Sequence, residues 1–254
     1  MENQTKKMQE LFSVKDKVII LTGGKGFLGS HYAEFLTKAG AKIVIWNLPE
    51  VDITDEEAVK KALNEVIEKY GRVDVLINNA AMNPKVGDEN SKKLFAPIDD
   101  YPLELWTNEL KVDLTGMFLC TKAVVSVMKK QKFGSIINVA SEVSVIAHDH
   151  RVYNESGKYK SPAYVTAKAG VLGFTRSCAA QLGKYNIRVN ALSPGGVENP
   201  KMPRDFVERF ASTNMLGRMA KPDEYNSAIL FLCSEASSFM TGHNLVIDGG
   251  KSAW

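Results

Sequence analysis

The chain has 254 residues, with 44% hydrophobic and 24% charged side chains and a formal net charge of +3 at pH 7. These values fit one soluble domain with a full core, and they exclude the basic excess of a nucleic-acid-binding protein. No apolar run is long enough to cross a membrane, and the polar first residues lack the apolar segment of a signal peptide. We therefore expect a cytoplasmic protein with no membrane or nucleic-acid partner, whose cysteines are reduced and lie in apolar helices: Cys120, Cys178 and Cys233.

Short apolar runs alternate with amphipathic stretches of helical length, which is the pattern of strand–helix units on a parallel sheet. Residues 1–13 are expected to form a mobile arm, followed by a single dinucleotide-binding catalytic domain over residues 14–254. Several strand runs are apolar without alternation, as in strands covered by helices on both faces. The sequence therefore predicts an α/β fold with a Rossmann-type doubly wound parallel sheet, whose strands occupy residues 17–21, 42–46, 73–78, 134–139, 187–192 and 243–247.

The connection after the second strand is too short for a parallel crossover, which needs about a dozen residues or more. Only Leu-Pro-Glu-Val separates Asn47 from Asp52, and Asp55 then begins the amphipathic helix that leads to the next strand. We predict that edge strand 3 and its helix are missing or shortened.

A glycine-rich loop follows the first strand and begins the first helix of the domain. Glycines let the backbone turn tightly and approach a pyrophosphate, and the helix N-terminus stabilises the negative charge. Because the loop opens a strand–helix–strand unit, we expect it to bind a dinucleotide through Gly23, Gly24, Lys25, Gly26, Phe27, Leu28 and Gly29.

Five further motifs follow in order: N-N-A-A, N-V-A-S, Y-V-T-A-K, P-G-G-V and D-G-G. Together with the glycine loop they resemble the short-chain dehydrogenase/reductase family over about residues 14–250. The resemblance implies an NAD(P)-dependent oxidoreductase with Ser141, Tyr164 and Lys168 as catalytic residues. It also implies that the cofactor is contacted by Asn47, Asp52, Ile53, Asn79, Ala80, Ala81, Tyr164, Lys168, Pro194, Gly195, Val197 and Asn199.

The Tyr164 and Lys168 pair has a physical rationale of its own. Residues four apart on a helix share a face, so the ammonium of Lys168 is expected to lower the pKa of the Tyr164 phenol. A phenol with a lowered pKa can act as the general base for an alcohol. Ser141 is expected to hold the substrate oxygen by a hydrogen bond.

Two positions depart from the family's pattern. Phe27 stands where short members have their middle glycine, a spacing that resembles the extended members, which include nucleotide-sugar epimerases and dehydratases. Those members carry a separate substrate domain, for which a chain ending at Trp254 leaves no room, so the single-domain branch is favoured. Asp113 stands where the family usually has a relay asparagine, and we expect it either to complete the proton relay or to cap or kink its helix.

An insertion at residues 148–162 makes the spacing from Ser141 to Tyr164 about ten residues longer than is common in the family, at little cost in chain entropy. Its polar and basic residues predict a polar flap over the substrate, with residues 198–215 on the other side of the pocket. The two histidines in His148-Asp149-His150 lack a third ligand at a suitable spacing, so we expect solvated histidines and no metal.

The predicted reaction interconverts a secondary alcohol and a ketone on a small polar substrate. The flap and the segments SPGGVEN and LGRMAKPDE resemble members of bacterial surface-sugar and flagellin-glycan pathways, which implies a sugar or sugar phosphate rather than a fatty or steroid alcohol. Two alternatives stay open: a nucleotide-sugar epimerase or dehydratase that retains its cofactor, and a non-catalytic cofactor-binding regulator.

NAD is expected over NADP, because Glu50 and Asp52 would repel a 2′-phosphate whereas only Lys25 would attract one; Asn47 favours neither. NADP stays possible. The family resemblance also implies a homodimer or homotetramer formed through the long helices after Asp100 and before Lys184.

Overall fold

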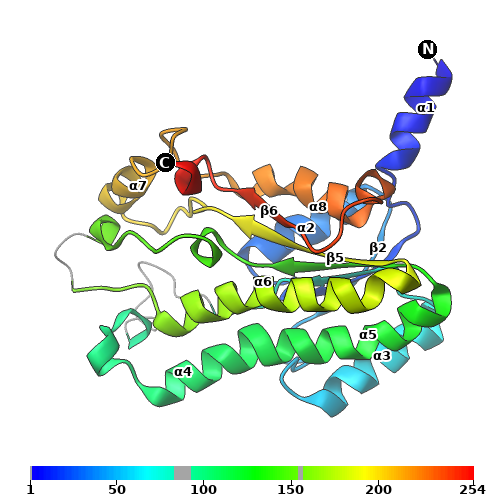
Figure 1. Cartoon of the computed structure of the whole chain (residues 1–254), viewed down its shortest axis with the longest axis horizontal. Helices are drawn as coiled ribbons and strands as arrows, with labels where there is room; N and C mark the ends of the chain where they lie inside the picture. The colour runs from blue at the N-terminus through cyan, green and yellow to red at the C-terminus, as the bar shows by residue number, and fades with distance from the viewer. Residues whose placement is uncertain (1, 83–92, 154–156) are drawn as a thin grey trace.

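The structure is a computed structural model that describes residues 2–82, 93–153 and 157–254. Its centre is a six-stranded parallel sheet in the order β2-β1-β3-β4-β5-β6 (Figure 1). The strands span β1 Val18–Thr22, β2 Lys42–Trp46, β3 Val75–Asn78, β4 Gly134–Val139, β5 Ile187–Pro194 and β6 Asn244–Ile247. All six strands predicted from the sequence are confirmed, with shifts of a few residues at their ends.

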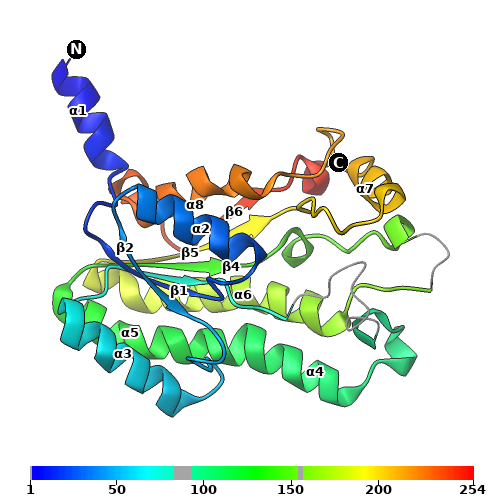
Figure 2. The ribbon, with the colours of Figure 1, turned by 180° about the vertical axis from the view of Figure 1, so that it is seen from behind.

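Helices cover both faces of the sheet, as expected for a doubly wound fold (Figures 1 and 2). The α-helices of the described residues span α1 Glu2–Leu11, α2 Phe27–Lys38, α3 Glu56–Tyr70, α4 Leu103–Leu110, α5 Met117–Gln131, α6 Pro162–Leu182, α7 Arg204–Ala211 and α8 Asn226–Cys233. Alternate strand residues face opposite layers: Ile20 packs with α3 and α5, whereas Ile19 and Leu21 pack with α2 and α8. Both faces are therefore buried, which explains the unbroken apolar strand runs.

The sheet ends at β2, which pairs only with β1 among the described strands. The chain after β2 makes a tight turn, in which the Val51 N–H donates to the Asn47 carbonyl at 2.9 Å. It then enters α3, where the Asp55 side chain accepts from the N–H groups of Glu57 and Ala58. The predicted absence of the outer strand and its helix is confirmed.

The N-terminal segment, expected as an arm, is helical over α1 and extends away from the sheet at the end opposite α7 (Figures 1 and 2). Its mobility stays a prediction. The three cysteines are free thiols, and Cys120 and Cys233 are fully buried. In the described part of the chain, no helix is both long and apolar enough to traverse a bilayer.

Candidate active site

The residues expected to act together lie at the carboxyl ends of the strands. Ser141 follows β4, the Asn79 segment follows β3 and Gly195 follows β5, while α6 brings Tyr164 and Lys168 to the same end. In an open α/β sheet this edge is where ligands bind.

The glycine loop after β1 forms a close-packed cradle. Gly23 adopts the left-handed region at φ +65°, and a Cβ there would lie 2.8 Å from the Ala80 Cα. The Asn79 side-chain amide fastens the loop by donating to the carbonyls of Thr22 and Gly23, both at 3.1 Å. At Gly29, a Cβ would clash with the Gly23 carbonyl oxygen.

The cradle fits a pyrophosphate. Helix α2 begins after Gly26, and no side chain caps its first N–H groups, so these donors face the loop. Phe27 and Leu28 form the first turn of α2, where Leu28 packs against the core. Ala80 and Ala81 follow β3 at the same edge. These residues would hold the diphosphate of a dinucleotide.

The turn after β2 contacts the glycine loop on the side where the adenosine of a dinucleotide is expected to lie. Lys25 pairs with Glu50 at 2.6 Å, and its N–H donates to the Asn47 side chain at 3.3 Å. Asp52 accepts two hydrogen bonds of 2.8 Å from Thr54, which hold the pKa of its carboxyl below the usual value. Ile53 is buried and lies against Gly116.

The expected catalytic side chains converge. The Ser141 hydroxyl lies beside the Tyr164 hydroxyl and lowers its pKa, and the Lys168 ammonium lies 5.5 Å from the centre of the Tyr164 ring. Lys168 donates to the Val139 carbonyl at 3.0 Å and forms an ion pair with Asp113 at 3.6 Å. This lysine is 3% exposed and Asp113 is fully buried. The sequence spacing thus brings four of the expected residues into one site.

Comparison with known proteins agrees with this geometry. A family profile described as Enoyl-(Acyl carrier protein) reductase matches residues 17–252. Trans-4-hydroxycyclohexanecarboxylate dehydrogenase of Sinomonas cyclohexanicum is 34% identical over 267 residues, covering 94% of each protein. The 3-oxoacyl-(acyl-carrier-protein) reductase of Thermotoga maritima is 33% identical over 261 residues, covering 93% of this chain and 98% of that protein. A crystal structure of a short chain dehydrogenase from Leptospira borgpetersenii with bound NAD+ has a TM-score of 0.84 at 28% identity and covers 94% of each chain.

The chain belongs to the short-chain dehydrogenase/reductase family. It is an NAD(P)-dependent oxidoreductase that acts on CH–OH groups. The expected family and enzyme class are confirmed.

One electrostatic expectation for this short-chain dehydrogenase/reductase is wrong. Burial raises the pKa of the Tyr164 phenol above its usual value, the Asp113 carboxylate raises it further, and the hydrogen bond with Ser141 lowers it only in part. Because Lys168 is shared with Asp113 and a backbone carbonyl, its ammonium does not offset burial in this arrangement. The protonated phenol is the form that donates a proton to a ketone oxygen.

Asp113 lies in a π-helical segment, Lys111–Gly116, between α4 and α5. One carboxylate oxygen accepts the Met82 N–H at 2.7 Å. Burial raises the pKa of Asp113, while Lys168 and the Met82 N–H lower it. The helix departs from regular α geometry at Asp113, in line with the expected kink, and the part of Asp113 in a proton relay stays a prediction.

A buried polar cluster at the start of α6 escaped the sequence reasoning. The Ser161 hydroxyl accepts the Tyr164 N–H at 3.1 Å and donates to Glu109, while Tyr101 donates to the same carboxylate at 2.6 Å. The signal was present: Ser161-Pro162 is a helix start, and Glu109 is one helical turn before Asp113. This cluster fixes the end of the helix that carries Tyr164.

A second buried pair lies directly beside Ser141. Glu142 and Lys251 form an ion pair at 2.8 Å with 5% and 4% of their side chains exposed. The Lys251 ammonium also lies 3.8 Å from the centre of the Phe210 ring. Burial raises the pKa of Glu142, and Lys251 lowers it. No local pattern connects two residues so far apart in the sequence.

The polar flap predicted for the insertion is wrong in part. Val152 and Tyr153 are buried in an aromatic cluster, which we define as Phe95, Tyr153, Phe206 and Phe210 together with their apolar neighbours. Tyr153 stacks on Phe206 with ring centres 5.7 Å apart. Phe206 and Phe210 belong to α7, so residues 198–215 pack directly against the insertion, and their place on the other side of a substrate pocket stays a prediction. Residues 154–156 of the flap lie outside the described residues.

His148 is also not the solvated histidine that was expected. Both ring nitrogens are shielded from solvent, and the ring lies 5.3 Å from Tyr153, centre to centre. Burial lowers the pKa of His148 to about 3, so its ring is neutral. In the ranges that the structure describes, no group of three or more His, Cys, Asp or Glu side chains is arranged to hold a metal ion.

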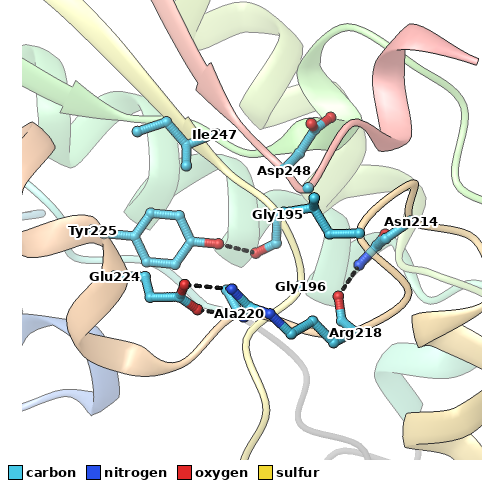
Figure 3. A pocket seen from close by; sticks show the side chains of 11 residues that line it. Gly195, Gly196, Asn214, Arg218, Ala220, Glu224, Tyr225, Ile247 and Asp248 are labelled. Carbon is cyan, nitrogen blue, oxygen red and sulfur yellow. Dashed lines mark hydrogen bonds and ion pairs between the residues drawn. The ribbon is translucent and has the colours of Figure 1, made fainter.

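The loop after β5 lies over a cavity of about 60 Å³ (Figure 3). The Tyr225 hydroxyl donates to the Gly195 carbonyl at 3.3 Å, and Gly195 donates from its N–H to Ile247 at 2.8 Å. Pro194 pairs with Ile247, Val197 forms a bridge with Ala220, and Asn199 accepts the Lys201 N–H. The described lining contains none of Ser141, Tyr164 and Lys168. The cavity is therefore separate from these three residues.

Proposed function

We propose that this enzyme interconverts a secondary alcohol and a ketone on a small ring-shaped polar substrate, with NAD as the preferred cofactor. The observation that carries the proposal is the convergence of Ser141, Tyr164 and Lys168 beside the glycine cradle. A bound nicotinamide cofactor supplies or accepts the hydride.

The chain's own groups handle the proton. In reduction, the Tyr164 hydroxyl donates its proton to the ketone oxygen, and in oxidation the phenolate takes the proton of the alcohol. Ser141 donates a hydrogen bond to the same substrate oxygen and stabilises the charge that develops there. Lys168 orients the tyrosine, and Asp113 holds Lys168 in place.

The Sinomonas relative supports a ring as the substrate, because it is a dehydrogenase of a hydroxycyclohexanecarboxylate. The aromatic cluster is buried behind the segment that carries Ser141, since Phe210 lies at Lys251 and the Lys251 partner Glu142 directly follows Ser141. A sugar or sugar phosphate stays a candidate, which would put the enzyme in carbohydrate biosynthesis, and a hydroxycycloalkane carboxylate joins it because of the Sinomonas relative.

The cofactor preference rests on the turn after β2. Glu50 holds the Lys25 ammonium and adds a negative charge where a 2′-phosphate would lie, which favours NAD. Family likeness supports a cytoplasmic homodimer or homotetramer. Light scattering after gel filtration measures that assembly.

The test is turnover with both nicotinamide cofactors on a panel of sugars, sugar phosphates, 4-hydroxycyclohexanecarboxylate isomers, cyclopentanol and a 3-oxoacyl thioester. Tyr164→Phe is expected to lower kcat by roughly 10²–10⁴ with cofactor affinity retained, because the hydroxyl moves a proton. Retained turnover in that variant would refute the proposal. Product formation without net change in nicotinamide absorbance would instead support the epimerase or dehydratase alternative.

A further inference from the structure

The insertion places a second ammonium group beside the ring of Tyr164. Lys160, the last residue before the Ser161 cap of α6, has its Nζ 4.1 Å from the centre of the Tyr164 ring. The Nζ of Lys168 lies 5.5 Å from the same centre. The nearer cation therefore comes from the inserted loop rather than from α6 itself.

Lys160 is held in this position by its neighbours. Ser161, the next residue, forms hydrogen bonds with Glu109 and Tyr101. The backbone N–H of Lys160 donates to the His150 Nδ1 at 3.5 Å. Partial burial lowers the pKa of Lys160 to about 8, while Glu142 and Glu109 stabilise its charged form. The side chain is therefore predominantly an ammonium at neutral pH.

The charges that act on Tyr164 come from several elements, and the negative ones raise its pKa. Asp113 from the π-helical segment, Glu142 from the segment after β4 and Glu109 from α4 all disfavour the phenolate. The groups that favour the phenolate are the Ser141 hydroxyl and the two ammonium groups that lie at the ring, those of Lys160 and Lys168.

A cation at an aromatic ring is attracted by the electrons of its face. Ionisation of a phenol places more negative charge in the ring, so the attraction is greater for the phenolate than for the phenol. We propose that Lys160 is a positioning residue that favours the ionised form of Tyr164 through its ring, while Lys168 is engaged by Asp113 and Val139. This inference rests on the proposed role of Tyr164 in proton transfer.

The test compares Lys160→Met with Lys158→Met, a matched change at an exposed lysine of the same loop. In alcohol oxidation at about pH 6–7, where Lys160 is an ammonium, kcat/KM of Lys160→Met is expected to be about tenfold below that of the wild type. The deficit shrinks as the pH rises through the pKa of Lys160, because the wild-type lysine then loses its charge as well. Lys160→Arg keeps a charge and is expected to retain the wild-type kcat/KM at about pH 6–7, and Lys158→Met is expected to leave the profile unchanged.

A second measurement needs no turnover. The tyrosinate difference absorbance of the NAD+ complex is taken in each background relative to the matching Tyr164→Phe variant. It is expected to rise at a lower pH in Lys160→Arg, whose guanidinium stays charged, than in Lys160→Met. Superimposable kcat/KM profiles for Lys160→Met and Lys158→Met would overturn the inference, as would equal tyrosinate titrations in Lys160→Arg and Lys160→Met. A raised KM with an unchanged kcat would also overturn it, because it would assign Lys160 to substrate binding. Failure of the proposed function is distinguished by Tyr164→Phe, which would then keep its activity.

Discussion

Replacement of Lys251 by Met removes one half of the buried ion pair beside Ser141. At 2.8 Å and an effective dielectric constant of about 20, the attraction between the two charges is about 6 kcal/mol. The desolvation of both groups offsets part of that energy, and breaking such a pair costs about 3–5 kcal/mol. The methionine keeps most of the aliphatic volume, so the main change is an uncompensated carboxylate.

Protonation of Glu142 limits the loss. Converting a carboxyl with an unfolded-state pKa of about 4.3 to its neutral form costs at most about 3.7 kcal/mol at pH 7 and about 1 kcal/mol at pH 5. Burial already raises the folded-state pKa of Glu142, and loss of Lys251 raises it further. A group with a raised folded-state pKa stabilises the fold below its unfolded-state pKa, and that contribution is lost as the pH rises through the folded-state pKa.

The assay is thermal unfolding followed by circular dichroism between pH 5 and pH 8 at fixed protein concentration. At pH 7 a loss of about 3.7 kcal/mol corresponds to a Tm lowered by about 7–15 °C in a chain of this size, with a much smaller change at pH 5. The double variant Glu142→Gln with Lys251→Met is expected to recover most of the loss at pH 7. Equal Tm changes at pH 5 and pH 8, or a double variant no better than the single one, would refute this reasoning.

Two further predictions concern the reaction. Asp113→Asn removes the carboxylate that raises the pKa of Tyr164. The acid limb of the kcat/KM profile for alcohol oxidation is therefore expected to move to lower pH by about one unit. An unmoved limb would leave Asp113 with a structural role alone. Glu50→Gln releases Lys25 and removes a negative charge where the 2′-phosphate of NADP is expected to lie, so kcat/KM with NADP is expected to rise about tenfold. The Tm is expected to change little, because exposed ion pairs add little stability. A cofactor ratio equal to that of the wild type would show that the turn after β2 does not select the nucleotide.

The sequence predicted the sheet because its strands are local apolar runs bounded by turns. The four residues between Asn47 and Asp52 were enough to predict the missing edge, since chain length alone forbids a crossover there. Tyr164 and Lys168 were predictable because their spacing places them on one helix face and their motif resembles the family's.

What the sequence could not predict depends on contacts between distant segments. The flap was expected to be polar from its charged residues, yet Tyr153 becomes buried because α7 supplies Phe206 as its partner. The direction of the Tyr164 pKa was predicted wrongly because the i, i+4 rule describes Lys168 on an isolated helix, whereas burial and Asp113 act on the tyrosine from the folded interior.

The end of the sheet at β2 has a consequence for redesign. The turn after β2 is a single tight turn, held by the hydrogen bond from the Val51 N–H to the Asn47 carbonyl and by the ion pair between Lys25 and Glu50. Because no outer strand packs over it in the described structure, Leu48, Pro49 and Glu50 of this turn are exposed and open to exchange, while Val51 packs against the core and has to stay apolar. Under the proposed function, the nucleotide preference therefore belongs to a surface turn that can be replaced by another, whereas the buried groups around Tyr164 cannot be changed without affecting the core.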